Sequence, residues 1–302
     1  MAMKAVMNWF GKPPALAERV PRIAPRVEPV VQPAQAPAPG APVRRPLWTP
    51  QRLAATDALW GDGYQLPGGE IETLRLAKPL GLSAASTMLL LGAGTGGAAC
   101  SVSVKLGAWV SGFEADPSLA AAATDRVARL NLTKRVQIES WDPVEPVFRQ
   151  HFYNHGHALE PLRGAAPELV LAALSTGLKA NAQFSMTELV ADVPLERTDP
   201  EVAAWAAVEC RDPSGVPTET AITRILSRLG FDVRIVEDVS QRNMEQALTG
   251  WRIAVKVMED DRPNASKAMG FVLEAELWLH RVRLMQLGRL RLVRWHAIGG
   301  GR

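Results

Sequence analysis

The chain contains few cysteines and no long hydrophobic run, and each shortage excludes a class of protein. Its 302 residues include only 2 cysteines, too few for a disulfide framework or a cysteine-rich zinc site. Apolar runs such as residues 88–91 are far shorter than the roughly 18 residues that a membrane-spanning helix needs. The N-terminus lacks the continuous apolar segment of a secretion signal. We therefore expect a globular cytoplasmic protein, with any attachment to a membrane or a larger complex made by its N-terminal segment.

Basic charge is scarce outside that segment. The chain carries 34 Lys and Arg against 31 Asp and Glu, a net charge of +3. Residues 1–48 hold seven of the basic residues and only two glutamates, which leaves 27 basic and 29 acidic residues for everything after. A nucleic-acid-binding domain normally presents a basic face. We therefore expect no nucleic-acid partner for the folded part.

Residues 1–48 are rich in proline and alanine, a composition that neither sustains a helix nor supplies a core. We expect a disordered tether there. Its first ten residues place Trp9 and Phe10 close to Lys12, which is the composition of a short peptide that docks on a protein or a membrane surface.

From residue 49 onward, short apolar runs alternate with longer amphipathic segments, a pattern typical of βαβ units and a parallel sheet. The first helix is expected to begin at Thr49-Pro50 and the second to span residues 69–78. Strands are expected at residues 87–91, 109–114, 135–140, 168–174, 183–190, 231–238 and 289–297. Later helices are expected at residues 95–106, 117–131, 144–160, 198–209, 217–229, 241–259 and 264–287. We expect one α/β domain over residues 49–302.

A glycine-rich turn follows the first expected strand. The sequence from Gly92 to Gly97 reads GAGTGG and leads into a helix. Glycine lets the backbone turn sharply and approach a ligand closely, while the amides at the helix N-terminus remain free to bind it. Two patterns fit: Gly92, Gly94 and Gly97 match the dinucleotide pattern G-x-G-x-x-G, and Gly92, Gly94 and Gly96 match the pattern G-x-G-x-G. The spacing alone leaves both open.

Acidic residues follow the next two expected strands. Glu114 ends the second strand, 22 residues after Gly92, and Ala115 follows it. A carboxylate there can accept hydrogen bonds from both hydroxyls of a ribose. Asp142 follows the third strand next to Trp141, in positions to receive an adenine amino group and to pack on its ring. Turn and carboxylates together predict a site for an adenosine-bearing ligand.

The position of this turn behind two helices, and the late strands separated by a long helical stretch, resemble the class I S-adenosylmethionine-dependent methyltransferase family over residues 55–302. The resemblance implies a Rossmann-like, seven-stranded, mostly parallel sheet whose antiparallel last strand lies between the fifth and sixth. It implies S-adenosylmethionine as the cofactor. The residues that it places around this cofactor are Gly92, Ala93, Gly94, Gly96, Glu114, Ala115 and Asp142.

The segment from Trp60 to Gly69 reads WGDGYQLPGG and is similar to a motif of phosphoethanolamine and other small-amine N-methyltransferases. In that family the motif tyrosine contacts substrate and cofactor and pairs with a histidine, and Tyr64 occupies its position. The resemblance implies methyl transfer to a small molecule or a lipid headgroup. Because Glu188 ends the fifth expected strand, where α/β proteins bind ligands, we expect it to contact substrate or accept a proton.

No metal site is expected, because His151, His155 and His157 have no carboxylate or cysteine at a diagnostic spacing. We interpret their segment as solvated and polar.

Three departures from the family pattern support alternatives to methyl transfer. Leu90 stands where the family usually has an acidic residue. The expected fourth strand, 168–174, is followed by neither the family's acid nor its histidine, and the next strand begins too soon for a full crossover. One alternative is an inactive methyltransferase-like scaffold that docks through its N-terminal segment. The other is a nicotinamide-dependent oxidoreductase, which the dinucleotide reading of the glycines favours.

Overall fold

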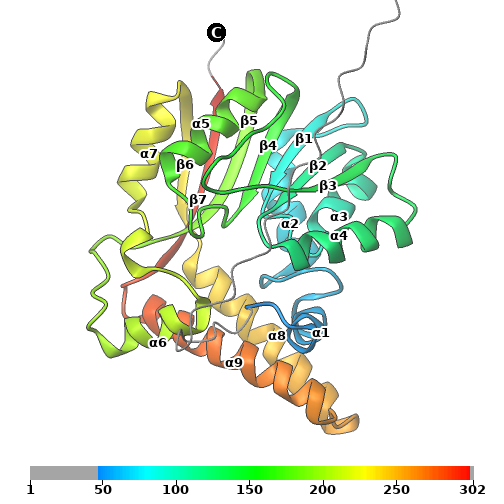
Figure 1. Ribbon diagram of the computed structural model, residues 1–302, viewed down its shortest axis with the longest axis vertical. Helices are drawn as coiled ribbons and strands as arrows, with labels where there is room; N and C mark the ends of the chain where they lie inside the picture. Colours follow the sequence, from blue (N-terminus) through cyan, green and yellow to red (C-terminus); the bar gives the residue numbers. More distant parts are fainter. Residues whose placement is uncertain (1–46, 300–302) are drawn as a thin grey trace, which may run out of the picture. The chain divides into compact units, whose positions relative to one another are not determined.

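The computed structural model describes residues 47–299, which form an α/β domain around one seven-stranded sheet (Figure 1). The strand order is β3-β2-β1-β4-β5-β7-β6. The strands are β1 (Thr87–Leu91), β2 (Trp109–Glu114), β3 (Val136–Ser140), β4 (Tyr153–Leu159), β5 (Leu178–Val190), β6 (Phe231–Asp238) and β7 (Arg291–Gly299). Only β7 runs antiparallel to its neighbours, and it lies between β5 and β6. The predicted sheet is therefore confirmed.

Nine α-helices and two short 3-10 helices lie in the described part of the chain. The α-helices are α1 (Pro50–Trp60), α2 (Gly69–Ala77), α3 (Gly97–Leu106), α4 (Pro117–Arg129), α5 (Pro167–Gly177), α6 (Pro200–Glu209), α7 (Glu219–Arg228), α8 (Ser240–Asp260) and α9 (Ala265–Gln286); the 3-10 helices are η1 (Lys78–Leu80) and η2 (Pro213–Gly215). Three α-helices begin with a polar cap followed by proline, at Thr49, Asp116 and Asp199. Proline suits this position because its missing N–H would have no partner in the first turn.

The prediction was wrong between residues 144 and 177. A helix was expected over 144–160 and a strand over 168–174, whereas the structure has β4 at Tyr153–Leu159 and α5 at Pro167–Gly177. The apolar run of α5 fits a buried strand or a buried helix equally well by periodicity. Pro167 at its first position and its length of 11 residues favour the helix. Since β4, α5 and β5 form a regular crossover, the expected shortened connection is also wrong.

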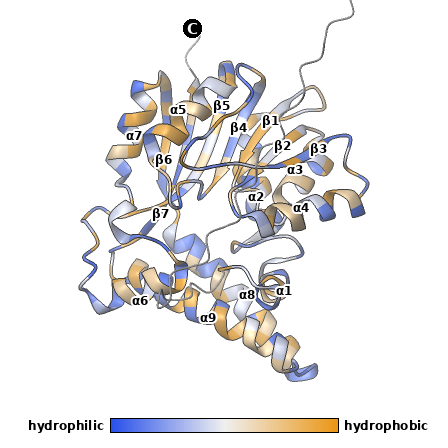
Figure 2. Ribbon diagram, in the orientation of Figure 1, coloured by the Kyte–Doolittle hydropathy of each residue, from blue (hydrophilic) through white to orange (hydrophobic). Residues whose placement is uncertain are grey.

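Alternate residues of β1 pack on opposite faces of the sheet. Leu89 and Leu91 belong to a cluster with α5 and α7, whereas Met88 and Leu90 pack with α3. Hydrophobic and hydrophilic residues alternate along α7 (Figure 2), as expected for a helix with one face on a core. Leu90 is fully buried. Its side chain fills the core, where burial contributes about 1.5–3 kcal/mol.

Helices α8 and α9 connect β6 to β7 and lie near α1 and α6 at one end of the sheet (Figure 1). Glu274 of α9, which is 1% exposed, ties this layer to α1: its carboxylate accepts hydrogen bonds from Arg52 Nε at 2.7 Å and from Trp278 Nε1 at 2.8 Å. Because β6 ends where α8 begins, the layer lies at the carboxyl ends of the parallel strands, the usual ligand-binding edge of such sheets.

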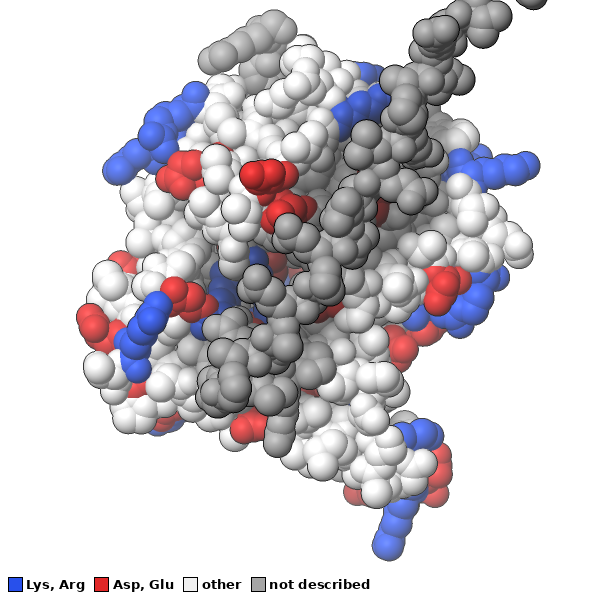
Figure 3. All heavy atoms as spheres, in the orientation of Figure 1, with Lys and Arg blue, Asp and Glu red and all other residues white. Residues whose placement is uncertain are grey.

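Within the described residues, no helix is long and apolar enough to cross a membrane. Almost all of the predicted tether, residues 1–48, lies outside the described residues, and so does the expected docking peptide at residues 1–10. Lys, Arg, Asp and Glu are interspersed over the visible face of the molecule (Figure 3).

Candidate active site

The glycine turn after β1 has the backbone that its sequence predicts. Gly92, Gly94 and Gly96 all adopt positive φ angles, of 72°, 56° and 92°, which residues with a Cβ rarely adopt. A Cβ on Gly92 would lie 2.2 Å from the carbonyl oxygen of Leu159. A Cβ on Gly94 would lie 2.0 Å from Oε1 of Gln65. The turn therefore depends on glycine for both its conformation and its close packing.

A cavity of about 390 Å³ lies against this turn. Its walls come from residues 63–76, from the residues that follow β2 and β4, and from the first turns of α8. Of the predicted cofactor residues, Gly92, Ala93, Gly94, Glu114 and Ala115 line it.

Two predicted cofactor residues do not line the cavity. Gly96 packs behind the turn, where a Cβ would meet Ala123 at 3.2 Å. Asp142 is exposed, and its Oδ1 accepts a hydrogen bond from the Val144 amide at 2.8 Å. It therefore caps a local turn, whereas its neighbour Trp141 does line the cavity.

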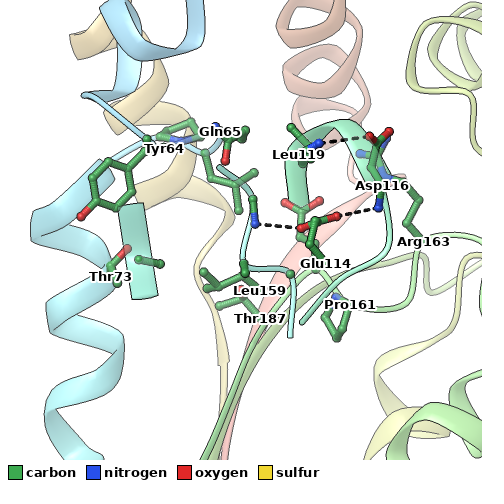
Figure 4. A pocket seen from close by; sticks show the side chains of 18 of the residues that line it. Tyr64, Gln65, Thr73, Glu114, Asp116, Leu119, Leu159, Pro161, Arg163 and Thr187 are labelled. Atoms are coloured by element: carbon green, nitrogen blue, oxygen red, sulfur yellow. Dashed lines mark hydrogen bonds between the residues drawn. The ribbon is translucent and has the colours of Figure 1, made fainter. Parts of the chain in front are cut away.

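Glu114 lies between two backbone amides at the cavity wall (Figure 4). Its Oε2 accepts a hydrogen bond from the Gly94 amide at 2.8 Å, and its Oε1 accepts one from the Asp116 amide at 3.0 Å. Burial raises the pKa of this carboxyl, although the two amide bonds oppose that shift. The side chain is 8% exposed, so a bound hydroxyl would meet a fixed acceptor.

Sequence reasoning missed several lining residues. Asp116, Pro117 and Leu119 line the cavity from the start of α4, and Asp116 caps that helix through its own Oδ1. The signal was present in the sequence, because Asp-Pro directly after an expected strand is a helix start. Gln65 was also missed: its Oε1 accepts from the Thr95 amide at 2.9 Å and so fastens the preceding segment to the glycine turn.

Comparison with known proteins relies on structure, since no family model and no curated protein matches the chain in sequence. The chain is similar to phosphoethanolamine N-methyltransferase 2 of Haemonchus contortus, solved with phosphomonomethylethanolamine and S-adenosylhomocysteine, with a TM-score of 0.73 and 18% sequence identity. The match covers 85% of this chain but only 59% of that one. The chain has the class I S-adenosylmethionine-dependent methyltransferase fold.

Other proteins with this methyltransferase fold differ in what they do. A putative sarcosine dimethylglycine methyltransferase from Galdieria sulphuraria matches with a TM-score of 0.65 and 12% identity, over 83% of this chain and 98% of that one. The [4+2]-cyclase SpnF matches with a TM-score of 0.63 and 17% identity, over 82% of this chain and 93% of that one. The fold alone therefore does not fix the reaction.

The Tyr64 ring lines the cavity, but its hydroxyl is bound elsewhere. The hydroxyl donates to the Gly97 carbonyl oxygen at 3.2 Å and also contacts Ser101 Oγ, both on α3. Figure 4 shows Tyr64 beside Thr73, on the opposite side of the view from Glu114. Burial raises the pKa of Tyr64 to about 12, so the phenol stays protonated near neutral pH.

Glu188 does not face the cavity, so the predicted orientation is wrong. The side chain is fully buried; its carboxylate accepts from the Leu162 amide at 2.7 Å and pairs with Arg211 at 2.9 Å. Successive strand residues point to opposite faces, and the neighbouring Thr187 lines the cavity instead.

The true fourth strand brings Glu160 and Arg163 to the cavity wall. Arg281 of α9 binds Glu160 through two hydrogen bonds, at 2.7 and 3.0 Å, and pairs with Glu209 at 2.7 Å. Arg163 donates to the Glu209 carbonyl oxygen at 2.9 Å. Although burial raises the pKa of Glu209, the Arg281 and Arg163 guanidinium groups outweigh it and lower this pKa to about 2. The two carboxylates, Glu160 and Glu209, are thus neutralised by the two guanidinium groups of Arg163 and Arg281.

The histidines of β4 lie in a sheet strand, His157 buried and His155 partly buried, which corrects the interpretation of their segment as solvated. His157 is fully buried, and burial lowers its pKa to about 4. None of the described residues that line the cavity is a histidine. With β4 correctly placed, the strand is followed by Glu160 and Pro161, so an acid does follow the fourth strand although no histidine comes next to it.

Proposed function

We propose that this protein is an S-adenosylmethionine-dependent methyltransferase that acts on a small molecule or a lipid headgroup. The observation that carries the proposal is the Glu114 carboxylate, held at the cavity wall by the amides of Gly94 and Asp116. A fixed carboxylate next to a glycine turn suits the two hydroxyls of a ribose.

The lining residues fit the rest of this cofactor. Gly92, Ala93 and Gly94 would approach its methionine portion, because these three residues line the cavity and carry no side chain larger than the methyl group of Ala93. Ala115, Leu119 and Trp141 would enclose its adenine. Asp142 stays a weaker candidate for the adenine amino group, because its carboxylate already caps a turn.

When bound, the cofactor would supply a methyl group on a sulfonium, an electrophile that needs little covalent help. The protein then has to align the acceptor and exclude water. Glu72 of α2 helps to close the cavity against water. Its Oε2 accepts a hydrogen bond from Gln246 Nε2 at 2.8 Å and one from Arg242 Nε at 2.9 Å, both on α8. These bonds connect the two helices whose residues line the substrate side of the cavity.

A specific observation supports a second candidate, a methyltransferase fold that transfers no methyl group. Leu90 fills the core where the family has an acidic residue, and the Tyr64 hydroxyl is bound to α3. SpnF, which is described as a [4+2]-cyclase, shares the fold. An inactive scaffold that docks through residues 1–48 is the form of this alternative that the sequence favours.

The packing of Gly97 argues against a nicotinamide cofactor. Its amide donates to the Gly63 carbonyl oxygen at 3.0 Å, and a Cβ there would lie 2.5 Å from that oxygen. The third glycine of the dinucleotide pattern is thus needed for contact with the preceding segment.

Isothermal titration of the full chain with S-adenosylmethionine, S-adenosylhomocysteine and NADH tests these alternatives. We expect micromolar binding of the first two and none of NADH. Glu114→Gln should weaken binding by at least about tenfold, because it loses a charge-assisted acceptor. Glu139→Gln, an exposed change on β3, is the matched control. If neither sulfur compound binds, the methyltransferase proposal fails and the scaffold is favoured.

A further inference from the structure

Asn243 is a buried polar residue of the cavity wall whose hydrogen bonding is incomplete. It lies in the first turns of α8, lines the cavity and is 6% exposed. Its Oδ1 is buried and has no hydrogen-bond partner among residues 47–299. A buried amide without a partner destabilises a fold relative to an apolar residue of the same shape. The presence of such a residue is explained if its free oxygen binds a ligand in the cavity.

The charged groups of the same cavity region are already occupied. Glu72 accepts hydrogen bonds from Arg75, Arg242 and Gln246. Glu160 is bound by Arg281. Arg163, the one cationic side chain among the described residues that line the cavity, pairs with Glu209 at 3.2 Å. None of these groups is free to neutralise an ionic group of a ligand.

The rest of the wall around this region combines apolar side chains with a few neutral polar ones, such as Thr73 and Thr187. Leu76, Val239 and Leu292 line it from α2, from the residue before α8 and from β7. A carboxamide has both donors and an acceptor, and rotation about its terminal torsion can present either side to the cavity. It therefore matches a group that also donates and accepts, such as a hydroxyl, next to an apolar body.

We propose that Asn243 positions the methyl acceptor, and that this acceptor is an uncharged small molecule with a hydroxyl or a similar hydrogen-bonding group on an apolar body. The inference rests on the proposed methyltransferase function. It separates this site from one for a phosphate ester, because a phosphate placed here would lose its hydration without gaining a free cation.

The test uses a matched series of probes that share one aromatic ring: benzyl alcohol, benzyl phosphate and benzylamine. Each is titrated by saturation-transfer NMR into the full chain saturated with S-adenosylhomocysteine. We expect benzyl alcohol to bind more tightly than either ionic probe. In Asn243→Leu its affinity should fall about tenfold, while the affinity for S-adenosylhomocysteine stays within about twofold.

Thermal unfolding supplies a second readout that a purely structural asparagine would not give. Asn243→Leu should raise the Tm, because it removes an unpaired buried amide oxygen. Asn243→Ala replaces it in the test if leucine does not fit. Gln241→Leu is the matched control: Gln241 is exposed on the same helix, and its side chain donates to Glu245 Oε1 at 2.9 Å. It should change neither probe affinity nor cofactor affinity.

Three results would overturn the proposal: tighter binding of benzyl phosphate or benzylamine than of benzyl alcohol, unchanged probe affinity in both Asn243 variants, or a lower Tm in both. Failure to detect any probe on a protein that binds S-adenosylhomocysteine also refutes it, and leaves the methyltransferase function standing. Absence of S-adenosylhomocysteine binding removes both proposals together.

Discussion

Arg281 of α9 and Glu160 at the end of β4 form a two-pronged ion pair, with Nη1 to Oε1 at 2.7 Å and Nη2 to Oε2 at 3.0 Å. Both side chains are almost fully buried. The pair connects residues 121 positions apart in sequence and fastens the inserted helical layer to the edge of the sheet that bears the cavity. Its geometry leads to a first prediction about stability.

Arg281→Met is expected to lower the free energy of unfolding by about 3–5 kcal/mol. Removing the guanidinium leaves Glu160 and Glu209 buried without their main partner, and an uncompensated buried charge is strongly destabilising. Urea denaturation at neutral pH measures the change. Arg283→Met, two positions along the same helix, removes only an exposed pair with Glu201 at 3.4 Å and should change stability by less than about 1 kcal/mol. Equal effects of the two variants would contradict this account.

His157 predicts a pH dependence. Its folded pKa is about 4 and thus below the ordinary value of 6.5, because burial disfavours the charged ring. The unfolded chain therefore binds the proton more readily. The stability contributed by the neutral ring is complete above about pH 6.5 and is lost as the pH falls towards 4.

The measurement is the free energy of unfolding between pH 4 and 6.5 in the parent and in His157→Asn. Asparagine does not titrate and keeps a donor for the Ser185 carbonyl oxygen, which lies 3.2 Å from His157 Nδ1. The slope should decrease by up to about 1.4 kcal/mol per pH unit. Burial also lowers the pKa of His155, but that residue is present in both proteins and cancels in the comparison. Identical slopes would show that His157 does not titrate in this way.

Tyr64→Phe is expected to leave the affinity for S-adenosylhomocysteine within about threefold of the parent. The hydroxyl that it removes bonds to Gly97 and Ser101 of α3, whereas the ring that lines the cavity remains. Stability should fall by about 1 kcal/mol for the lost bonds. Titration calorimetry and urea denaturation give the two values. A loss of cofactor affinity above about tenfold would place the hydroxyl in the binding site after all.

The sequence predicted the structure correctly where a backbone conformation allows only one kind of residue. The strand and the turn after it were predictable, because a backbone with positive φ angles needs residues without a Cβ. The place of Glu114 at the cavity wall was predictable because it ends the neighbouring strand. The order of the sheet came from a family resemblance and was confirmed by the strand pairing.

The errors arose where a local pattern fits two structures. The apolar residues 168–174 are compatible with a buried strand or a buried helix. The polar histidines of β4 made its sequence look like a solvated segment, although it forms a strand of the sheet. The orientation of Glu188 could not be deduced, because a shift of one residue turns a strand side chain to the other face. Its partner Arg211 lies beyond α6, and only the tertiary structure brings the two together. Asn243 carried no local signal of any kind.

Gly92→Ala tests the glycine turn itself. The new Cβ would lie 2.2 Å from the Leu159 carbonyl oxygen, a backbone atom of the neighbouring strand that has little room to move, and φ at this position is 72°. Strain and collision together should lower the free energy of unfolding by more than about 2 kcal/mol. They should also abolish measurable binding of S-adenosylhomocysteine, because the turn that lines the cavity must shift from its position. Gly215→Ala is the matched control, since no atom of the described neighbours lies within 4 Å of a Cβ there and Gly215 has no positive φ. A Gly92→Ala protein that binds the cofactor as tightly as the parent would mean that the ligand does not contact this turn.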